Sequence, residues 1–508
     1  MKKTIIKVAA SASILLSLSS CSDWLQVEME DKIMEPVLFS NYPGYVAALN
    51  GVYMSLNDYY TVGSLNDILD VMAQYYYVTD DMRDNTYRIY QSYSFSDAGF
   101  ESKNGALWNK AYTLIANTNT ILDHLTSIGD TPLSQTQYNV LRGEALAMRA
   151  MLHFDILRRH GAIYATNPDA ETIPYQDDTS REIKPFLTNK AIMERIIGDL
   201  TEASSLLKES DPIITEGIRD TQVEDNGVAS YDMSFRQLRL NYYAVQGLLA
   251  RAYQWIGDKT NAYKVAKEEI IDKVTTESLE VFPWITDERV HADGKPDLMF
   301  STEVMFSLYH NQRSKYNSAV FASSISSSRR LTFYGENKDG EDSKVGLLYD
   351  YVNDYRRDQW ALADPPQGAG DDDNPIGTTL YLTKYDDFKS GATEETFRYM
   401  LPMIRLSEMY LIAAESASNA DEAYRLLNEV RLHRNCPSLE TSGNFNVDLL
   451  YEFARETLAE GQLYYFYKRR QETRIISRTG SYDFNMLLSN YIWPIPEAEL
   501  NKRTHSGK

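Results

Sequence analysis

Residues 401–434 read LPMIRLSEMYLIAAESASNADEAYRLLNEVRLHR, and the rest of the chain can be placed around this stretch. Apolar residues recur at helical spacing on both sides of a short polar break at residues 418–421. The two stripes consist of Leu406, Tyr410 and Ala413 before the break, and of Ala423, Leu426, Leu427 and Val430 after it. Alanines on the first helix leave room for a second helix to approach closely. The pattern predicts an antiparallel helix pair whose second helix is capped by Asn419 or Asp421.

Similar patterns predict further helices in the N-terminal half of the chain. They cover residues 41–57, 107–125, 138–159, 189–208, 240–256 and 259–272. The last two form a second pair that matches the tetratricopeptide template in part, because Leu249, Ala250 and Tyr253 stand where the template has L-G-x-x-Y. No regular period of about 34 residues runs through the chain, so the repeats are degenerate. The sequence predicts a mostly α fold built as a tetratricopeptide-like paired-helix scaffold.

A long, irregular and loop-rich insertion interrupts this scaffold between residues 274 and 400. Prolines, a serine tract at residues 323–328 and an acidic run at residues 368–374 all indicate loops. The segment is nevertheless dense in aromatic side chains. They are Trp284, Tyr309, Tyr316, Phe333, Tyr334, Tyr349, Tyr351, Tyr355, Trp360, Tyr381 and Tyr385. The insertion is either a ligand-binding face or a small core beneath loops, and the sequence leaves both readings open.

The start of the chain predicts export and a lipid anchor. A positively charged segment and a short apolar run precede L-S-S-C at residues 18–21, which resembles a bacterial lipobox. Residues 1–20 are therefore predicted to be a signal peptide, and Cys21 to carry lipid. Lipidation of Cys21 leaves Cys436 without a disulfide partner, so packing must stabilise the fold. The expected regions are the signal peptide (1–20), a lipidated tether (21–40), an N-terminal helical region (41–273), the insertion (274–400) and a C-terminal helical hairpin and tail (401–508).

Charge and motifs narrow the function. The chain has 51 Lys and Arg against 72 Asp and Glu, a net charge of −21 at pH 7, which disfavours binding to nucleic acid or to anionic membrane surfaces. It contains no HExxH, GxSxG, P-loop or Rossmann motif. The acidic residues 371–374 do not match an EF-hand, because Pro375 interrupts the alternation of ligands. We therefore expect no cofactor, no metal and no catalytic residue, with contact to the membrane through the lipid alone.

Several segments, taken in order, resemble the SusD/RagB family of Bacteroidetes outer-membrane lipoproteins. They are the W-x3-Y-x2-I-x3-N helix from Trp108 to Asn119, the G-E-A…R-A…F helix from Gly143 to Phe154, LLARAY at residues 248–253, RLSEMYL at 405–411 and WPIPEAE at 493–499. One segment departs from the family pattern. There Phe453, Leu463 and Phe466 replace the usual Arg, Arg and Asp, while Glu452, Glu456, Glu460 and Arg469 are retained. Buried charge pairs can be exchanged for apolar packing at little cost, so these replacements put a local ion network in doubt but not the fold.

The resemblance implies a lipoprotein of the outer membrane, facing the cell exterior, that captures an oligosaccharide and delivers it to a SusC-like TonB-dependent transporter. Aromatic rings pack well on the flat C–H faces of sugars. The candidate ligand contacts are Tyr75, Tyr76, Asn85, Arg88 and Tyr90 from the first irregular stretch, and Trp284, Tyr309 and Trp360 from the insertion. Arg405, Glu408 and Glu415 are expected to be structural.

Three alternatives remain. A surface glycoside hydrolase needs only two carboxylates at a suitable separation, which no sequence motif excludes. A RagB-like lid would bind peptide in place of glycan. A tetratricopeptide scaffold would bind only a protein partner, with the aromatic residues of the insertion serving as core.

Overall fold

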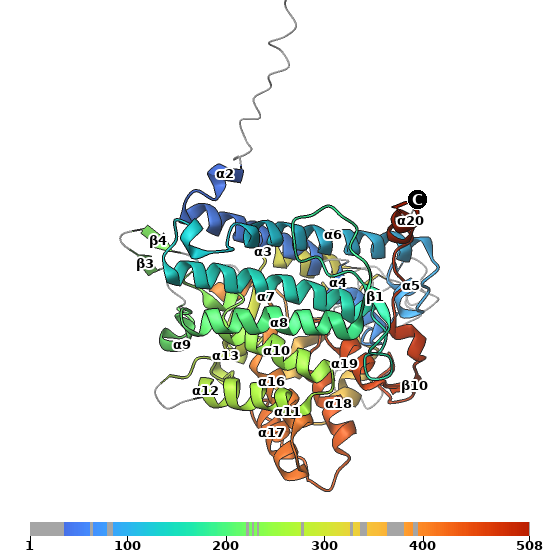
Figure 1. Cartoon of the computed structure of the whole chain (residues 1–508). Coiled ribbons are helices and arrows are strands. Elements are labelled where there is room, and N and C mark those ends of the chain that lie inside the picture. The colour runs from blue at the N-terminus through green and yellow to red at the C-terminus, as the bar shows by residue number, and fades with distance from the viewer. Residues whose placement is uncertain are drawn as a thin grey trace, which may run out of the picture.

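The structure is a computed structural model, and it describes residues 35–60, 64–78, 85–219, 223–225, 228–230, 233–275, 279–325, 329–335, 343–362, 380–389 and 395–506. The prediction of a mostly helical fold is confirmed (Figure 1). Cys21 and the acidic residues 371–374 lie outside the described residues. Within those residues, no helix combines the length and the apolar character that crossing a membrane requires.

The long helices are stacked in layers. They are α3 (Tyr42–Tyr60), α6 (Ala98–Asp123), α7 (Gln135–His160), α8 (Asn189–Lys208), α10 (Tyr242–Trp255), α16 (Leu406–Ser416) and α17 (Ala420–Leu432). Figure 1 shows α3 and α6 at the top, α7, α8 and α10 beneath them, and α16 and α17 near the bottom. Close packing of α7 on α8 depends on Gly143, since a Cβ there would lie 2.8 Å from Leu207 Cγ. The scaffold predicted from helical spacing is thus the frame of the molecule.

Local sequence explains where several of these helices begin and end. Asp97 caps α6 by accepting a hydrogen bond from the backbone N–H of Gly99 at 2.7 Å, so this helix begins earlier than predicted. Ser134 and Gln137 form a capping box at the start of α7, and Gly161 ends that helix as expected. The second predicted pair has the expected extent, but its second helix is divided into α11 (Lys259–Tyr263), a π-helix, η3 (Lys264–Ile271), and α12 (Asp272–Val274).

The predicted helix pair at residues 401–434 is confirmed as α16 and α17, and Asn419 is the residue that caps α17. Its side chain accepts a hydrogen bond from the Glu422 backbone N–H at 2.9 Å. The first residues of the stretch form a strand instead of a helix: β8 (Met400–Arg405) pairs antiparallel with β5 (Val304–Tyr309) from the insertion. The insertion is therefore bonded directly to the strand that leads into α16.

The remaining elements are short. The helices are α2 (Glu35–Leu38), α4 (Leu65–Met72), α5 (Arg88–Gln91), α9 (Ile213–Glu216), α13 (Asp287–Val290), α14 (Arg313–Val320), α15 (Lys344–Leu348), α18 (Phe445–Glu456), α19 (Leu463–Arg470) and α20 (Glu497–Ser506). The 3₁₀ turns are η1 (Ile128–Asp130), η2 (Arg236–Leu238), η4 (Ser301–Glu303), η5 (Tyr355–Gln359), η6 (Thr396–Tyr399) and η7 (Leu488–Tyr491). Two-stranded antiparallel pairs are β1 (Glu171–Ile173) with β2 (Leu187–Thr188), β3 (Val223–Asp225) with β4 (Val228–Ser230), β6 (Trp360–Leu362) with β7 (Leu380–Leu382), and β9 (Arg474–Ile475) with β10 (Phe484–Asn485).

The aromatic residues of the insertion mostly join the main hydrophobic core. Tyr316, Phe333, Tyr349, Trp360 and Tyr385 are each 2% exposed or less, and they belong to the same buried cluster as the helices of the scaffold. Of the two readings that the sequence left open, core packing therefore holds for these five residues. A ligand-binding role must rest on the few aromatic side chains of the insertion that remain at the surface.

Candidate functional site

Four of the predicted ligand contacts lie inside the protein. Tyr75 and Tyr76 are buried, with 2% or less of each residue exposed, and the Tyr75 hydroxyl donates a hydrogen bond to the carbonyl of Ala454. Asn85 is buried, and its Oδ1 accepts a hydrogen bond from the backbone N–H of Tyr87 at 3.0 Å. Tyr90 is buried and packs on Phe100. Side chains enclosed in this way present no face to a ligand, which corrects the prediction for these four residues.

Two other candidates, Trp360 and Trp284, are also placed by packing. Trp360 is 1% exposed and stacks on Phe333 at 4.0 Å between ring centroids. Trp284 is half-buried and stacks on His433 at 4.4 Å, beneath the end of α17. Arg88 is half-buried at the start of α5, away from the pocket described next, and its role in binding stays a prediction.

Tyr309 is the candidate that the structure leaves at the surface. It is 48% exposed at the end of β5, and its ring lies 5.3 Å from that of Tyr399 at an interplanar angle of 50°. The Asn57 side chain fixes the backbone there by donating to the Tyr309 carbonyl at 2.9 Å. Tyr309 stands on the rim of a pocket of about 570 Å³, within the size range of small-ligand sites. The pocket is lined by Asn50, Tyr53, Met54, Ser234, Phe235, Leu238, Arg239, Leu308, Tyr309, Glu395, Thr396 and Tyr399.

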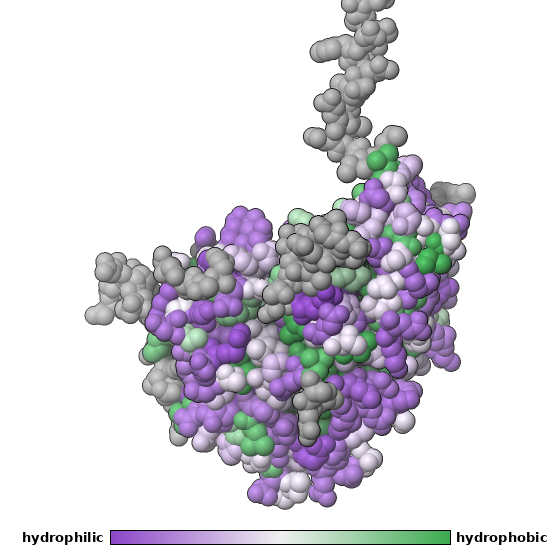
Figure 2. Space-filling view, turned by 90° about the vertical axis from the view of Figure 1, so that its left-hand side faces the viewer, coloured by the Kyte–Doolittle hydropathy of each residue, from purple (hydrophilic) through white to green (hydrophobic). Residues whose placement is uncertain are grey.

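Three parts of the chain build this pocket. Asn50, Tyr53 and Met54 follow i, i+3, i+4 spacing and therefore lie on one face of α3. The segment before and through η2 supplies the second wall, and the end of β5 with η6 supplies the third. Figure 2 faces the side of the molecule on which β3 and β4 lie in Figure 1, and patches of green apolar surface lie there among purple polar surface.

A buried ion system holds the wall formed by α3 and η2. The Tyr53 hydroxyl donates to Glu144 at 2.8 Å, and the Arg239 guanidinium lies 4.8 Å from the Tyr53 ring centroid. Arg239 also donates to Asn50 Oδ1 at 2.6 Å. Arg236 bonds Glu144 and Asp211 from below, and these partners raise its pKa despite burial, which alone would lower it. The pocket wall is consequently rigid and has little free charge.

The backbone at Phe235 is strained where it meets the pocket. Phe235 has a φ of 49°, a left-handed conformation that costs a bulky residue about 1–3 kcal/mol. Its backbone N–H donates to the carbonyl of Arg219 at 2.6 Å, which holds it in that conformation. Such strain persists only where surrounding contacts enforce it, and it is concentrated at ligand sites.

Sequence reasoning missed most of the pocket. It identified Tyr309 but not Asn50, Met54, Arg239 or Glu395, because these residues come from segments that meet only in the folded chain. One signal was present on α3. Met54 is 72% exposed, so an apolar residue stood on the outer side of an amphipathic helix, next to Asn50 and Tyr53.

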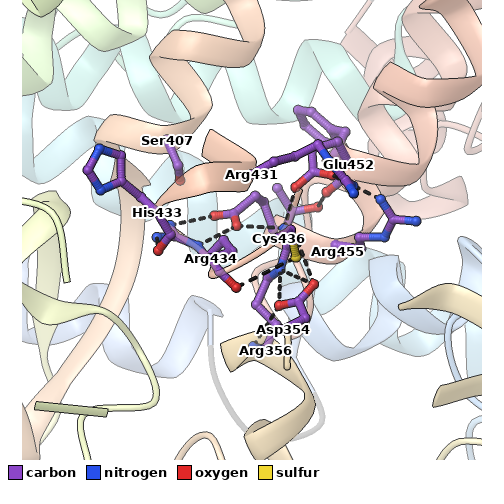
Figure 3. A network of polar contacts seen from close by, with 12 residues as sticks. Asp354, Arg356, Ser407, Arg431, His433, Arg434, Cys436, Glu452 and Arg455 are labelled. Carbon is purple, nitrogen blue, oxygen red and sulfur yellow. Dashed lines mark hydrogen bonds and ion pairs between the residues drawn. The ribbon is translucent and has the colours of Figure 1, made fainter. Parts of the chain in front are cut away.

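A second polar cluster lies beneath the insertion, and its buried carboxylates are the ones to consider for a catalytic role. Glu456 accepts hydrogen bonds from Arg434 at 2.7 Å, Arg356 at 2.9 Å and Arg405 at 2.8 Å. Figure 3 shows the neighbouring part, where Arg356, Arg431 and Arg455 converge on Glu452. These side chains are 5% exposed or less. We name this set, together with Glu303 and Asp354, the buried ion cluster.

The buried ion cluster is paired throughout, which suits a structural role. Burial alone would raise the pKa of Glu452, but Arg356, Arg455 and Arg431 lower it to about 2. Arginines likewise hold the pKa of Glu456 well below its usual value. A general acid needs a raised pKa and access to substrate, and neither carboxylate has them. Among the described residues, no group of three or more His, Cys, Asp or Glu side chains is arranged to hold a metal ion.

The structure also shows whether the ion network that the sequence put in doubt is formed. The ion network is present, with its cations supplied by Arg356, Arg405, Arg431, Arg434 and Arg455. Phe453 and Phe466, where the family pattern has Arg and Asp, stack on each other at 4.3 Å. An aromatic pair thus lies at these positions, beside the ion network. The structural roles expected for Arg405, Glu408 and Glu415 are confirmed, since Glu408 pairs with Arg251 and Glu415 with Arg469 and Arg470.

Comparisons with known proteins agree with this architecture. A family profile described as "Starch-binding associating with outer membrane" matches residues 23–217, and one described as "SusD family" matches residues 250–505, which is half of the chain. No curated protein sequence matches the chain.

Solved structures with the same fold cover nearly the whole chain. A SusD superfamily protein from Bacteroides vulgatus has a TM-score of 0.65 at 19% identity, covering 92% of this chain and 98% of its own. One from Bacteroides thetaiotaomicron has a TM-score of 0.64 at 20% identity, covering 91% and 98%. Surface glycan-binding protein A from Bacteroides thetaiotaomicron, solved with laminarihexaose, has a TM-score of 0.60 at 16% identity, covering 91% and 97%. On the match of the family profile to half of its length, the chain belongs to the SusD family.

Proposed function

We propose that this protein is an outer-membrane lipoprotein that captures an oligosaccharide in the Tyr309 pocket and passes it to a SusC-like TonB-dependent transporter. Membership of the SusD family supports the general role. The similar structure solved with laminarihexaose supports a glycan as the kind of ligand. The observation that carries the proposal for this chain is the exposed Tyr309 ring at the rim of a preformed pocket.

The pocket has the two kinds of surface that a sugar needs. The ring of Tyr309 and the exposed Met54 side chain offer apolar area to the C–H face of a pyranose. Asn50 Oδ1 accepts a hydrogen bond from Arg239. The Nδ2 amide of Asn50 donates no hydrogen bond to another described side chain. That amide and the Thr396 hydroxyl are groups that a sugar hydroxyl or ring oxygen can bond.

Calorimetric titration tests the pocket as the glycan site. The wild-type protein is titrated with neutral hexasaccharides, laminarihexaose among them, and the Tyr309→Ala variant with each hexasaccharide that binds. We expect Tyr309→Ala to weaken binding by roughly tenfold or more, as loss of an aromatic stacking partner does. Leu487→Ala is the control, because Leu487 is also exposed, at 65%, but belongs to another part of the surface. Unchanged affinity in Tyr309→Ala would remove the pocket from the proposal.

The same titrations, together with an assay for released reducing sugar, separate the alternatives. Binding of peptides and of no glycan would favour the RagB-like lid, and release of reducing sugar by the purified protein would favour the hydrolase. Binding of neither class of ligand would favour the scaffold.

The membrane role needs its own test. We expect a large β-barrel to co-purify with the protein from detergent-solubilised membranes, and Cys21→Ser to release the protein from the membrane fraction. A Cys21→Ser variant that stays in the membrane fraction would contradict the lipid anchor.

A further inference from the structure

Each cation near the pocket already has an acidic or amide partner. Arg239 is committed to Asn50, at 2.6 Å, and to Glu144, 3.8 Å away. Arg398 lies over the Tyr399 ring, with its guanidinium carbon 5.5 Å from the centroid, and donates to both oxygens of Asp387, at 2.6 and 2.9 Å. Both arginines are thus already paired before an anion enters the pocket.

The third cation is paired with an acid of the pocket itself. Lys295 bonds Oε1 of Glu395, which lines the pocket and whose side chain is 39% exposed. The second carboxylate oxygen of Glu395 accepts no hydrogen bond from a described residue. A ligand in the pocket therefore meets a carboxylate that is paired with Lys295 but has one oxygen open to a hydrogen-bond donor.

We propose that the pocket selects uncharged sugar residues and rejects uronic acids, with Glu395 as the specificity-determining residue. This inference rests on the glycan-binding function proposed above.

The physical argument has two parts. A carboxylate that enters the pocket loses water, and this loss is costly unless a cation replaces it. Every cation nearby is already paired with Asn50, Glu144, Asp387 or Glu395, so a ligand carboxylate would have to share that cation with its present partner. The ligand carboxylate would also be repelled by Glu395, and salt screens that repulsion. A neutral hydroxyl loses water at a lower cost and is not repelled, and it can donate a hydrogen bond to Glu395.

A matched pair of ligands tests the proposal on the full mature protein. One is a neutral hexasaccharide that binds, and the other is the same molecule with its C6 hydroxymethyl groups oxidised to carboxylates. The two share a backbone and differ in charge, and calorimetry measures both affinities. We expect oxidation to weaken binding by about tenfold or more, and the loss to shrink as salt rises from 50 to 500 mM, roughly a threefold fall in screening length.

The variant Glu395→Gln assigns the effect to a residue. It removes the repulsion and releases Lys295, so we expect it to recover most of the affinity for the oxidised ligand while the neutral ligand still binds. Glu202→Gln is the control, because Glu202 is also half-exposed and paired, with Arg142, but lies on α8 outside the pocket. It should leave the ratio of the two affinities unchanged.

The outcomes separate the inference from the proposed function. Equal or tighter binding of the oxidised ligand, still lost in Tyr309→Ala, overturns the selection against uronic acids and leaves glycan binding intact. An unchanged affinity ratio in Glu395→Gln overturns the role of Glu395. Absence of binding by any neutral or acidic glycan overturns the proposed function, and this inference with it.

Discussion

The buried ion cluster and the Tyr309 pocket use similar residues in opposite ways. In the cluster, Glu456 bonds three arginines and is 2% exposed, so no polar atom is left for a ligand. In the pocket, Tyr309 is 48% exposed, and one carboxylate oxygen of Glu395 accepts no hydrogen bond from a described residue. The insertion contributes to both, through Arg356 in the cluster and Tyr309 in the pocket.

The difference separates a cluster that holds the fold together from the pocket that we propose to bind the ligand. The cluster ties η4 and η5 of the insertion to α18 and to the turn that follows α17, through Glu303, Arg356, Arg434 and Glu456. Arg405 and Arg434 flank the α16–α17 helix pair, and both bond Glu456. Partial exposure and incomplete pairing, not the abundance of aromatic or charged residues, distinguish the pocket that we propose as the binding surface.

The largest expected effect comes from breaking the buried ion cluster. Glu456→Ala leaves Arg356, Arg405 and Arg434 with uncompensated buried charge, and we expect it to lower the free energy of unfolding by about 3–5 kcal/mol. Urea denaturation followed by circular dichroism measures the change. Lys389→Ala serves as the control, because it breaks the exposed Lys389–Asp293 pair, which water and salt screen, and it should cost far less than Glu456→Ala. Equal costs for the two variants would mean that the cluster is not the structural anchor.

The second largest expected effect is the loss of the stability that the buried ion cluster contributes when the pH falls. The pKa of Glu452 is lowered from its ordinary value of 4.5 to about 2, so its contribution is present above pH 4.5 and is lost as pH falls toward 2. By about 1.4 kcal/mol per pKa unit, this loss is roughly 3 kcal/mol. His153 acts in the same direction from pH 6.5 downward, because burial lowers its pKa to about 3. Asp386 acts in the opposite direction, since burial raises its pKa to about 6.

Denaturation at several pH values isolates the part due to Glu452. The slope of the unfolding free energy between pH 4.5 and 2 should be shallower in Glu452→Gln than in the wild-type protein. Parallel slopes in the two proteins would show that Glu452 does not carry the acid sensitivity.

The smallest expected effect on stability is at the pocket. Tyr309→Ala should change the free energy of unfolding by less than about 0.5 kcal/mol, because the side chain is half in water and its hydroxyl bonds no described residue. Tyr76→Ala, a matched change in the core, should cost about 3 kcal/mol or more. Thermal unfolding compares the two variants directly. A large loss in Tyr309→Ala would make this ring part of the core and not of a binding surface.

Sequence patterns predicted the frame well because its helices are local and periodic. The 401–434 pair, α8 and the Gly161 stop follow from spacing and capping that neighbouring residues determine. The site was harder, since the residues next to a Tyr do not show whether other segments will cover its ring. Tyr76 is buried and Tyr309 is half-exposed because of what distant parts of the chain place over them. Arg239 and Glu395 reach the pocket through contacts between distant segments, which no spacing rule shows.

Hydrogen–deuterium exchange with and without a bound neutral hexasaccharide tests the central claim most directly. If the Tyr309 pocket is the site, backbone amides of residues 50–54 and 395–399 should exchange more slowly in the complex, while those of residues 85–93 stay unchanged. Protection of residues 85–93 with no change around the pocket would contradict the assignment and return the site to the first irregular stretch.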